Sequence, residues 1–241
     1  MIVGGRDTPS AAGLRRFHDD LLAAYGCQRW WPTQDEANPR FEILVGAVLT
    51  QHTAWTNVEI AIAALREAGP LTARALLEHA DLAELIRRAG PHRVKARRLQ
   101  ALCTWFVDRG GFQALEAWST ETLRADLLSL HGIGFETADV ILLYAFGRPC
   151  FVADAYAFRI LERYGWSDGP RNYERLRRRI EAVGPAEDAI FYDELHALIV
   201  AHARGRCHKR APDCAACALA PGCAHARAQA QPNTPRAEAG R

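Results

Sequence analysis

Four cysteines near the C-terminal end carry the clearest chemical signal in this sequence of 241 residues. They are Cys207, Cys214, Cys217 and Cys223, and they fall within a segment of 17 residues. Thiolates this close together repel one another unless a cation neutralises them, so the segment predicts a metal or iron–sulfur centre. Four thiolates also suit structural zinc. The long first gap and the absence of paired C-x2-C knuckles fit poorly with a zinc ribbon, and disulfides are not expected without a secretory signal.

The second signal is His131-Gly132-Ile133-Gly134, which leads into a helical pattern. Two glycines spaced two apart allow a sharp backbone turn and leave amide groups at the start of a helix, an arrangement that suits a phosphate. The same pattern is typical of a purely structural turn. Asp154 follows 20 residues after Gly134. Its carboxylate is a candidate functional acid and also a suitable N-cap for a helix that begins at the next residue.

Helical periodicity dominates the rest of the chain. Apolar residues recur at three- and four-residue steps, strand-like alternation is nearly absent, and Gly-Pro pairs separate several segments as turns. We therefore predict an all-α protein of about ten helices. Residues 226–241 contain no large apolar side chain, so we expect a disordered tail there. The apolar stripes cover residues 14–25, 58–65, 94–106, 123–130, 138–145, 173–183 and 190–199.

The composition excludes two broad classes of protein. No apolar run is long enough to cross a bilayer and the N-terminal segment has no apolar signal, so we expect a cytoplasmic protein, neither membrane-bound nor secreted. With 30 basic and 28 acidic residues, the net charge of +2 predicts no partner. Basic residues cluster at 87–98 and 171–179. These clusters are either solvated helix faces or contacts with a polyanion.

Three segments together resemble the endonuclease III superfamily of DNA repair glycosylases. They are LHGIGFETADVILLYAFGRP, VADAYAFRI and the C-x6-C-x2-C-x5-C pattern. The resemblance implies that residues 131–134 form a helix–hairpin–helix that contacts duplex DNA, and that Asp154 is the essential aspartate of the following loop. It also implies a [4Fe–4S] cluster on the four cysteines.

The same resemblance implies a fold of two all-α lobes with the DNA cleft between them. Residues 41–148 would form a six-helix barrel lobe that contains the hairpin. Residues 1–40 plus 149–225 would form the iron–sulfur lobe.

One departure from the family pattern concerns the lyase reaction. In bifunctional members, the second residue after the hairpin's last glycine is a lysine that forms a Schiff base with the sugar. Here that position is Glu136, and a carboxylate cannot do this amine chemistry. Lys95 and Lys209 are the only lysines, and the resemblance places both outside the pocket. We therefore expect lyase activity to be weak or absent.

The chain further resembles the monofunctional 3-methyladenine glycosylases of this superfamily. The resemblance implies a base pocket built from Trp30, Trp31 and Trp55, since indole faces attract the positive charge of a 3-methylated adenine. On the residues alone, Trp30-Trp31 is more typical of an anchor that holds the N-terminal segment against the core. The matching segments are Trp30-Trp31-Pro32, GAVLTQHT at 46–53, IGFETAD at 133–139 and Asp154-x-Tyr156.

The implied mechanism gives Asp154 the central role. Its carboxylate would stay ionised, stabilise an oxocarbenium-like sugar, and orient or deprotonate the attacking water. Glu136 either contacts the base or is a solvent-facing glutamate in the first turn of a helix. Gln51 or His52 fills the gap that the flipped nucleotide leaves, and the sequence does not choose between them.

The leading hypothesis is a monofunctional DNA N-glycosylase that acts as a monomer, with no membrane partner, and releases alkylated bases from duplex DNA. The first alternative is a glycosylase for another lesion, such as an oxidised pyrimidine or a mismatched base. The second is a non-catalytic protein that binds damaged DNA, and the third is an iron–sulfur redox sensor. Base release from a panel of lesions separates the first two from the leading hypothesis.

Overall fold

The computed structural model describes residues 9–28 and 30–230. Its regular structure is helical and contains no strand in these two ranges, which confirms the prediction of an all-α protein. None of the helices in the described ranges is long and apolar enough to span a membrane. The chain divides into two compact units.

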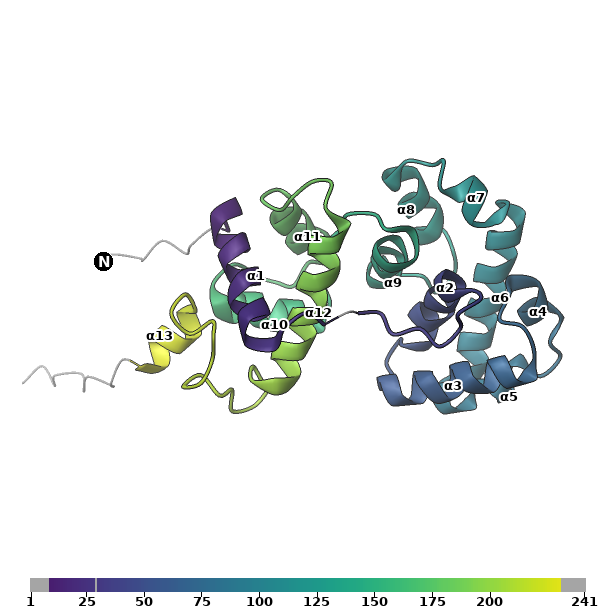
Figure 1. Cartoon of the computed structure of the whole chain (residues 1–241), viewed down its shortest axis with the longest axis horizontal. Helices are drawn as coiled ribbons and strands as arrows, with labels where there is room; N and C mark the ends of the chain where they lie inside the picture. The colour runs from purple at the N-terminus through teal and green to yellow at the C-terminus, as the bar shows by residue number, and fades with distance from the viewer. Residues whose placement is uncertain (1–8, 29, 231–241) are drawn as a thin grey trace, which may run out of the picture. The chain divides into compact units, whose positions relative to one another are not determined.

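The first unit, here called the hairpin unit, comprises residues 30–152 and 186–194. Helix α2 lies between α9 and α6 within this unit (Figure 1). Its helices are α2 (Pro39–Leu49), α3 (Trp55–Ala68), α4 (Ala73–Glu78), α5 (Leu82–Leu85), the 3-10 turn η1 (Arg87–Ala89), α6 (His92–Asp108), α7 (Gly111–Leu115), α8 (Thr120–Leu128), α9 (Phe135–Val140) and the π-helical η2 (Ile141–Ala145).

Helix α2 forms the centre of the hairpin unit because its sequence is apolar on nearly every face. Residues 41–49 are all buried, and a helix without a polar face must be surrounded by other elements. At its end, Lys95 is 1% exposed, and its Nζ donates hydrogen bonds to the Leu49 carbonyl at 2.7 Å and to the Ala89 carbonyl at 2.5 Å. The buried ammonium group thus satisfies carbonyls that the ends of α2 and η1 leave open.

The segment before α2 also belongs to the hairpin unit, although the predicted barrel lobe does not include it. The Glu42 carboxylate is 1% exposed and accepts the backbone N–H of Gln34 at 2.8 and 3.0 Å and that of Asp35 at 2.6 Å. A buried carboxylate needs such donors, so this contact fixes the segment to α2. Residues 30–40 lie in the hairpin unit, and residues 186–194 lie there as well.

The second unit, here called the cysteine unit, comprises residues 9–28, 153–185 and 195–230. Phe17 is packed against Tyr164 and Trp166, with ring centroids 5.0 and 5.3 Å apart, and this aromatic cluster fixes the first helix to the core. The helices of this unit are α1 (Ala11–Tyr25), α10 (Ala155–Tyr164), α11 (Tyr173–Glu181), α12 (Ala189–Gly205) from Leu195 onward, and α13 (Ala224–Ala230).

Helix α13 differs from the disordered tail expected from residue 226. It packs against α10, and Ala226 is buried. The segment lacks large apolar residues but is rich in alanine, which has the highest helix propensity and buries well in a close contact. Residues 231–241 of the predicted tail lie outside the described residues.

Candidate functional site

The predicted hairpin lies between α8 and α9. His131 is exposed, and Ile133 is 5% exposed and anchors the turn, where its N–H donates to the Leu130 carbonyl at 3.1 Å. Gly132 has φ +85° and lies so close to Arg98 that an added Cβ would overlap the arginine side chain. This position therefore requires glycine both for its left-handed backbone and for its packing.

Gln51 ties the loop after α2 to this hairpin. Its Nε2 donates to the Gly132 carbonyl at 3.1 Å and to Thr137 Oγ1 at 2.9 Å. Its Oε1 accepts a hydrogen bond from Arg98 at 2.5 Å. His52, the other candidate for filling the gap in the DNA, is exposed and has a left-handed backbone with φ +52°. The two candidates therefore differ in their contacts. Both amide hydrogens of Gln51 are engaged in holding the hairpin, whereas His52 is exposed.

The three tryptophans predicted to form a base pocket lie together in the hairpin unit. Trp55 contacts Trp30 and Trp31, with ring centroids 5.7 and 5.0 Å apart, and Trp31 contacts Tyr144 at 5.3 Å. Trp30 and Trp31 also line a cavity of about 310 Å³. The indole N–H groups of these two residues are buried and have no hydrogen-bond partner among the described residues. The site thus offers the aromatic faces of Trp30 and Trp31 to a bound group.

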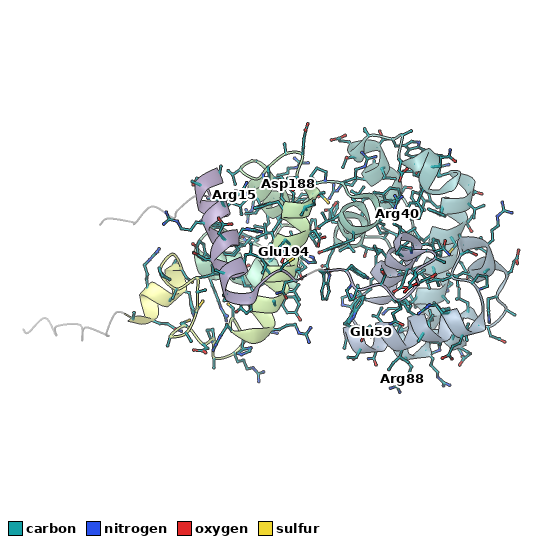
Figure 2. The ribbon with its side chains drawn as sticks, viewed as in Figure 1. Arg15, Arg40, Glu59, Arg88, Asp188 and Glu194 are labelled. Atoms are coloured by element: carbon teal, nitrogen blue, oxygen red, sulfur yellow. The ribbon has the colours of Figure 1, made fainter. Side chains whose placement is uncertain are left out.

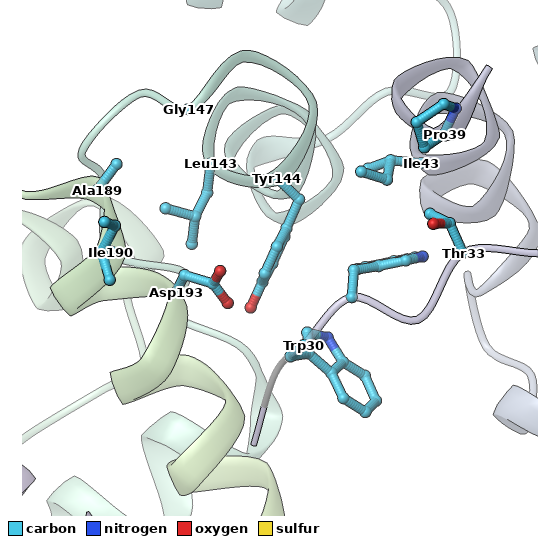
Figure 3. A pocket seen from close by; sticks show the side chains of 11 residues that line it. Trp30, Thr33, Pro39, Ile43, Leu143, Tyr144, Gly147, Ala189, Ile190 and Asp193 are labelled. Atoms are coloured by element: carbon cyan, nitrogen blue, oxygen red, sulfur yellow. The ribbon is translucent and has the colours of Figure 1, made fainter. Parts of the chain in front are cut away.

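Two further residues of this cavity were missed by sequence reasoning. Tyr144 lies in η2 and Asp193 in the first turns of α12, and both line the cavity. Figure 3 shows the Asp193 carboxylate pointing toward the Tyr144 hydroxyl. No motif marks Asp193, because its place in the hairpin unit depends on how α12 packs.

Asp154 lies in the cysteine unit and is the N-cap of α10, as one of its two predicted roles requires. Its Oδ1 accepts the Ala157 N–H at 2.7 Å. Its Oδ2 lies 3.7 Å from Nε2 of His196, and the two residues are 9% and 6% exposed. His196 was not singled out from the sequence.

Glu136, the other predicted catalytic residue, lies in the hairpin unit. Its side chain is exposed in the first turn of α9.

The four predicted metal-ligating cysteines all lie in the loop between α12 and α13, or at its ends. Cys207 accepts a hydrogen bond from Arg163 at 3.2 Å. Burial raises the pKa of the Cys217 thiol, a hydrogen bond that the Leu219 backbone donates to its sulfur lowers the pKa, and the charges of the other three cysteines raise it. No group of three or more His, Cys, Asp or Glu side chains is arranged to hold a metal ion within residues 9–28 and 30–230.

One histidine connects this loop to the core of the cysteine unit. His202 is 1% exposed, and burial together with Arg159 and Arg206 lowers its pKa to about 4, so the ring is neutral at pH 7. Its Nδ1 lies 2.8 Å from the Tyr25 hydroxyl and its Nε2 lies 3.6 Å from Sγ of Cys217. The sequence pattern gave no signal for this contact.

The two basic segments differ in what their arginines contact. Around α11, Arg171 makes two hydrogen bonds of 2.9 Å to Glu162. Arg177 pairs with Glu174 at 3.1 Å and with Glu181 at 2.5 Å. These guanidinium groups are engaged within the protein, which favours a solvated helix face over a polyanion contact for this segment.

Among the described residues, the basic segment 87–98 has more arginines without an ion pair than the α11 segment has. Arg88, Arg93 and Arg97 are exposed, and no ion pair involves them in the part of the chain that the structure describes. Figure 2 shows Arg88 extending away from the ribbon. An unpaired basic surface of this kind suits phosphate groups.

A family model described as the HhH-GPD superfamily of base excision DNA repair proteins matches residues 45–186. This range is more than half of the chain and contains the hairpin, Gln51 and Asp154. The protein belongs to the HhH-GPD superfamily. The resemblance to the endonuclease III superfamily of DNA glycosylases is thereby confirmed.

Curated relatives of this HhH-GPD protein include DNA repair enzymes from an archaeon and a bacterium. A Methanocaldococcus jannaschii protein, provisionally named a DNA repair glycosylase, is 41% identical over 203 residues, which are 82% of this chain and 90% of the relative. Endonuclease III of Escherichia coli K12 is 29% identical over 181 residues, which are 74% of this chain and 81% of the relative.

The HhH-GPD fold of this chain is similar to solved structures of two kinds of glycosylase. A trapped covalent intermediate of endonuclease III and DNA has a TM-score of 0.73 at 22% identity, covering 93% of this chain and 100% of the other. An H. pylori 3-methyladenine DNA glycosylase bound to 1,N6-ethenoadenine has a TM-score of 0.62 at 26% identity, covering 80% and 95%. These matches do not single out the 3-methyladenine glycosylases, so the substrate stays a prediction.

Proposed function

We propose that this protein is a monofunctional DNA N-glycosylase that hydrolyses the N-glycosidic bond of alkylated, 3-methyladenine-like bases in duplex DNA. The observation that carries the monofunctional part is the position of its amines. Glu136 stands where a Schiff-base lysine would be, Lys95 is buried with its Nζ bonded to two carbonyls, and Lys209 lies in the cysteine loop. Within the described residues of the hairpin unit, Lys95 is the one lysine, and its amine is buried and engaged, which supports hydrolysis by water.

The substrate class follows from the aromatic cavity. A 3-methylated adenine carries positive charge, which weakens its glycosidic bond, so the leaving group needs little help from an acid. A pocket that prefers the cation is then the main requirement, and each indole face contributes about 0.5–2 kcal/mol to that preference. Trp30 and Trp31 supply such faces, and the Asp193 carboxylate adds negative charge to the same cavity.

The catalytic role belongs to Asp154. The Ala157 N–H holds one carboxylate oxygen at 2.7 Å, which fixes the orientation of the side chain. The other oxygen then stabilises positive charge on the sugar and orients or deprotonates the attacking water. A role as helix N-cap and a role in catalysis are compatible, because they use different oxygens.

The four cysteines fit a [4Fe–4S] cluster by the chemistry of their donors. Cys207, Cys214, Cys217 and Cys223 are all thiols, and their mutual repulsion as thiolates requires a cationic centre. When bound, the cluster would hold the loop in one conformation. The loop then presents the basic side chains of Lys209 and Arg210 to DNA phosphates, with no reaction step at the cluster.

The proposal also covers the location, oligomeric state and partner of the enzyme. We expect a cytoplasmic monomer whose partner is damaged double-stranded DNA. The alternative is a glycosylase for another lesion, an oxidised pyrimidine or a mismatched base, with the same hydrolytic mechanism.

Release of free base from methylated duplex DNA, measured by mass spectrometry, tests this proposal. The wild-type protein should release 3-methyladenine, and Asp154→Asn should bind the same duplex but release almost none. Asp108→Asn, at an exposed position in α6, is the matched control and should behave as wild type. Release by Asp154→Asn at the wild-type rate would refute the mechanism. Release of oxidised pyrimidines alone would refute the substrate class, and strand cleavage without added base would refute the monofunctional assignment.

A further inference from the structure

Three residues from distant parts of the cysteine unit form one chain of polar contacts, with a buried histidine at its centre. Tyr25 is the last residue of α1, His202 lies near the end of α12, and Cys217 lies in the following loop. The Tyr25 hydroxyl is 2.8 Å from Nδ1 of His202, and Nε2 of His202 is 3.6 Å from Sγ of Cys217. Because the imidazole is 1% exposed, water does not compete for either nitrogen.

The identity of the donors follows from the state of Cys217. If Nδ1 of His202 carries the ring proton, Nε2 can only accept, and Cys217 must supply an S–H group. A cysteine that ligates a metal is a thiolate and has no proton to donate. The alternative tautomer places the proton on Nε2, where it points to Sγ, and Tyr25 then donates its hydroxyl proton to Nδ1. Only this arrangement leaves every group bonded when a metal is present.

We infer that Tyr25 and His202 form a hydrogen-bond relay to the thiolate of Cys217 that raises the reduction potential of the cluster held by the four cysteines. The inference rests on the [4Fe–4S] cluster of the proposed function and assigns neither residue to the base-release reaction. Both are positioning residues, since they act on the cluster through Cys217.

The direction of the effect follows from electrostatics. An N–H group directed at a cysteine sulfur stabilises negative charge on that sulfur, and the reduced cluster carries one more negative charge than the oxidised cluster. The hydrogen bond therefore favours reduction. Tyr25 strengthens the effect because its donation to Nδ1 fixes the tautomer and polarises the ring.

A second hydrogen-bond donor, Arg163, contacts the sulfur of another of the four cysteines, Cys207. Arg163 donates to Sγ of Cys207 at 3.2 Å, and its side chain also holds the carbonyls of His208 at 2.7 Å and Lys209 at 3.1 Å. Because Arg163 shapes the loop as well as contacting sulfur, its removal changes more than one property. His202 makes the cleaner test, since the two hydrogen bonds of its side chain are the relay itself.

The test is the one-electron reduction potential of the purified iron-loaded protein, measured by protein-film voltammetry. The iron and sulfide content and the EPR spectrum of each variant are measured on the same samples. His202→Phe should shift the potential to a more negative value. His202→Gln, which keeps an N–H donor, should recover part of the shift, and Tyr25→Phe should give a smaller shift in the same direction. His18→Phe is the matched control, since His18 lies in α1 and its Nδ1 contacts Asp19.

A His202→Phe protein that carries a full cluster at the wild-type potential would overturn the relay. If His202→Phe does not fold, Tyr25→Phe is compared with wild type instead. An unchanged reduction potential in Tyr25→Phe would also overturn the relay. A wild-type protein that contains zinc or no iron would overturn the inference together with the cluster assignment. Base release by that same preparation would leave the glycosylase proposal standing, so the two failures are distinguishable.

Discussion

The side-chain amide of Gln51 donates a hydrogen bond to the backbone carbonyl of Gly132, 3.1 Å away and 81 residues later in the sequence. The same amide nitrogen donates to Thr137, and its oxygen accepts from Arg98. The loop after α2 and the hairpin between α8 and α9 are therefore one hydrogen-bonded assembly. We expect a change in either part to affect the other.

Gln51→Ala should lower the free energy of unfolding by about 1–3 kcal/mol. The substitution leaves the half-buried Arg98 and Thr137 without their partner, and an unsatisfied buried group costs this much. Urea unfolding followed by circular dichroism measures the effect. Gln100→Ala, an exposed glutamine in α6, is the control and should change stability by less than about 0.5 kcal/mol. Equal stability of the two variants would show that the hairpin does not depend on Gln51.

Gly132→Ala and Gly134→Ala should differ sharply in stability. A left-handed backbone costs a residue with a Cβ about 1–2 kcal/mol, and Gly132 has φ +85° with Arg98 in contact. Gly134 has φ −94° and open space around its Cα, so alanine there should cost less than about 1 kcal/mol. Thermal unfolding of the two variants measures the difference. Identical midpoints would contradict the packing of Gly132 on Arg98.

Lys95 should make the stability of the protein depend on pH in the alkaline range. Burial and the nearby Arg98 lower its pKa from 10.5 to about 8 in the folded state. Between pH 8 and pH 10.5 the unfolded chain binds more protons at this group than the folded chain, so this contribution to stability increases as the pH rises. A neutral amine still has two N–H donors for the two carbonyls that it contacts.

Urea unfolding of wild type and Lys95→Met at several values from pH 7 to pH 10 tests this. The wild type should gain stability relative to Lys95→Met as the pH increases. Lys209→Met, at an exposed lysine, should show no such trend. A difference that is constant with pH would mean that Lys95 has an ordinary pKa in the folded protein.

Three substitutions at Asp154 should separate its helix cap from its proposed catalytic role. Asp154→Asn and Asp154→Ser keep a side-chain acceptor for the Ala157 N–H, whereas Asp154→Ala removes it and should lower stability by about 0.5–2 kcal/mol. All three should abolish base release. Thermal unfolding and single-turnover base release are measured on the same preparations. Activity that follows stability across the series, rather than the loss of the carboxylate, would contradict a catalytic Asp154.

Arg93→Gln and Arg97→Gln should each weaken binding to duplex DNA and reduce its salt dependence. Each lost phosphate contact lowers the slope of log K against log salt by about 0.9. Arg171→Gln is the matched control, because Arg171 is engaged with Glu162. Fluorescence anisotropy over a range of salt concentrations measures the slopes. An unchanged slope for Arg93→Gln and Arg97→Gln, with a reduced slope for Arg171→Gln, would move the DNA contact to the α11 segment.

The sequence alone determined the features that depend on local spacing. Apolar residues at three- and four-residue steps predicted helices, because one face of a helix must be buried. The sequence also predicted the G-x-G turn, the Asp154 cap and the four cysteines. Each of these motifs consists of residues that lie close together along the chain. The tail was misjudged at residues 226–230, where alanines form a helix that gains its stability from packing against α10.

Tertiary structure decided which distant residues act together. Tyr25 meets His202 across 177 residues of sequence, and Gln51 meets Gly132 across 81. Asp193 lines the aromatic cavity only because α12 begins in the hairpin unit. Contacts of this kind leave no periodic trace in one sequence, because they arise from how helices pack, and that packing depends on many side chains at once.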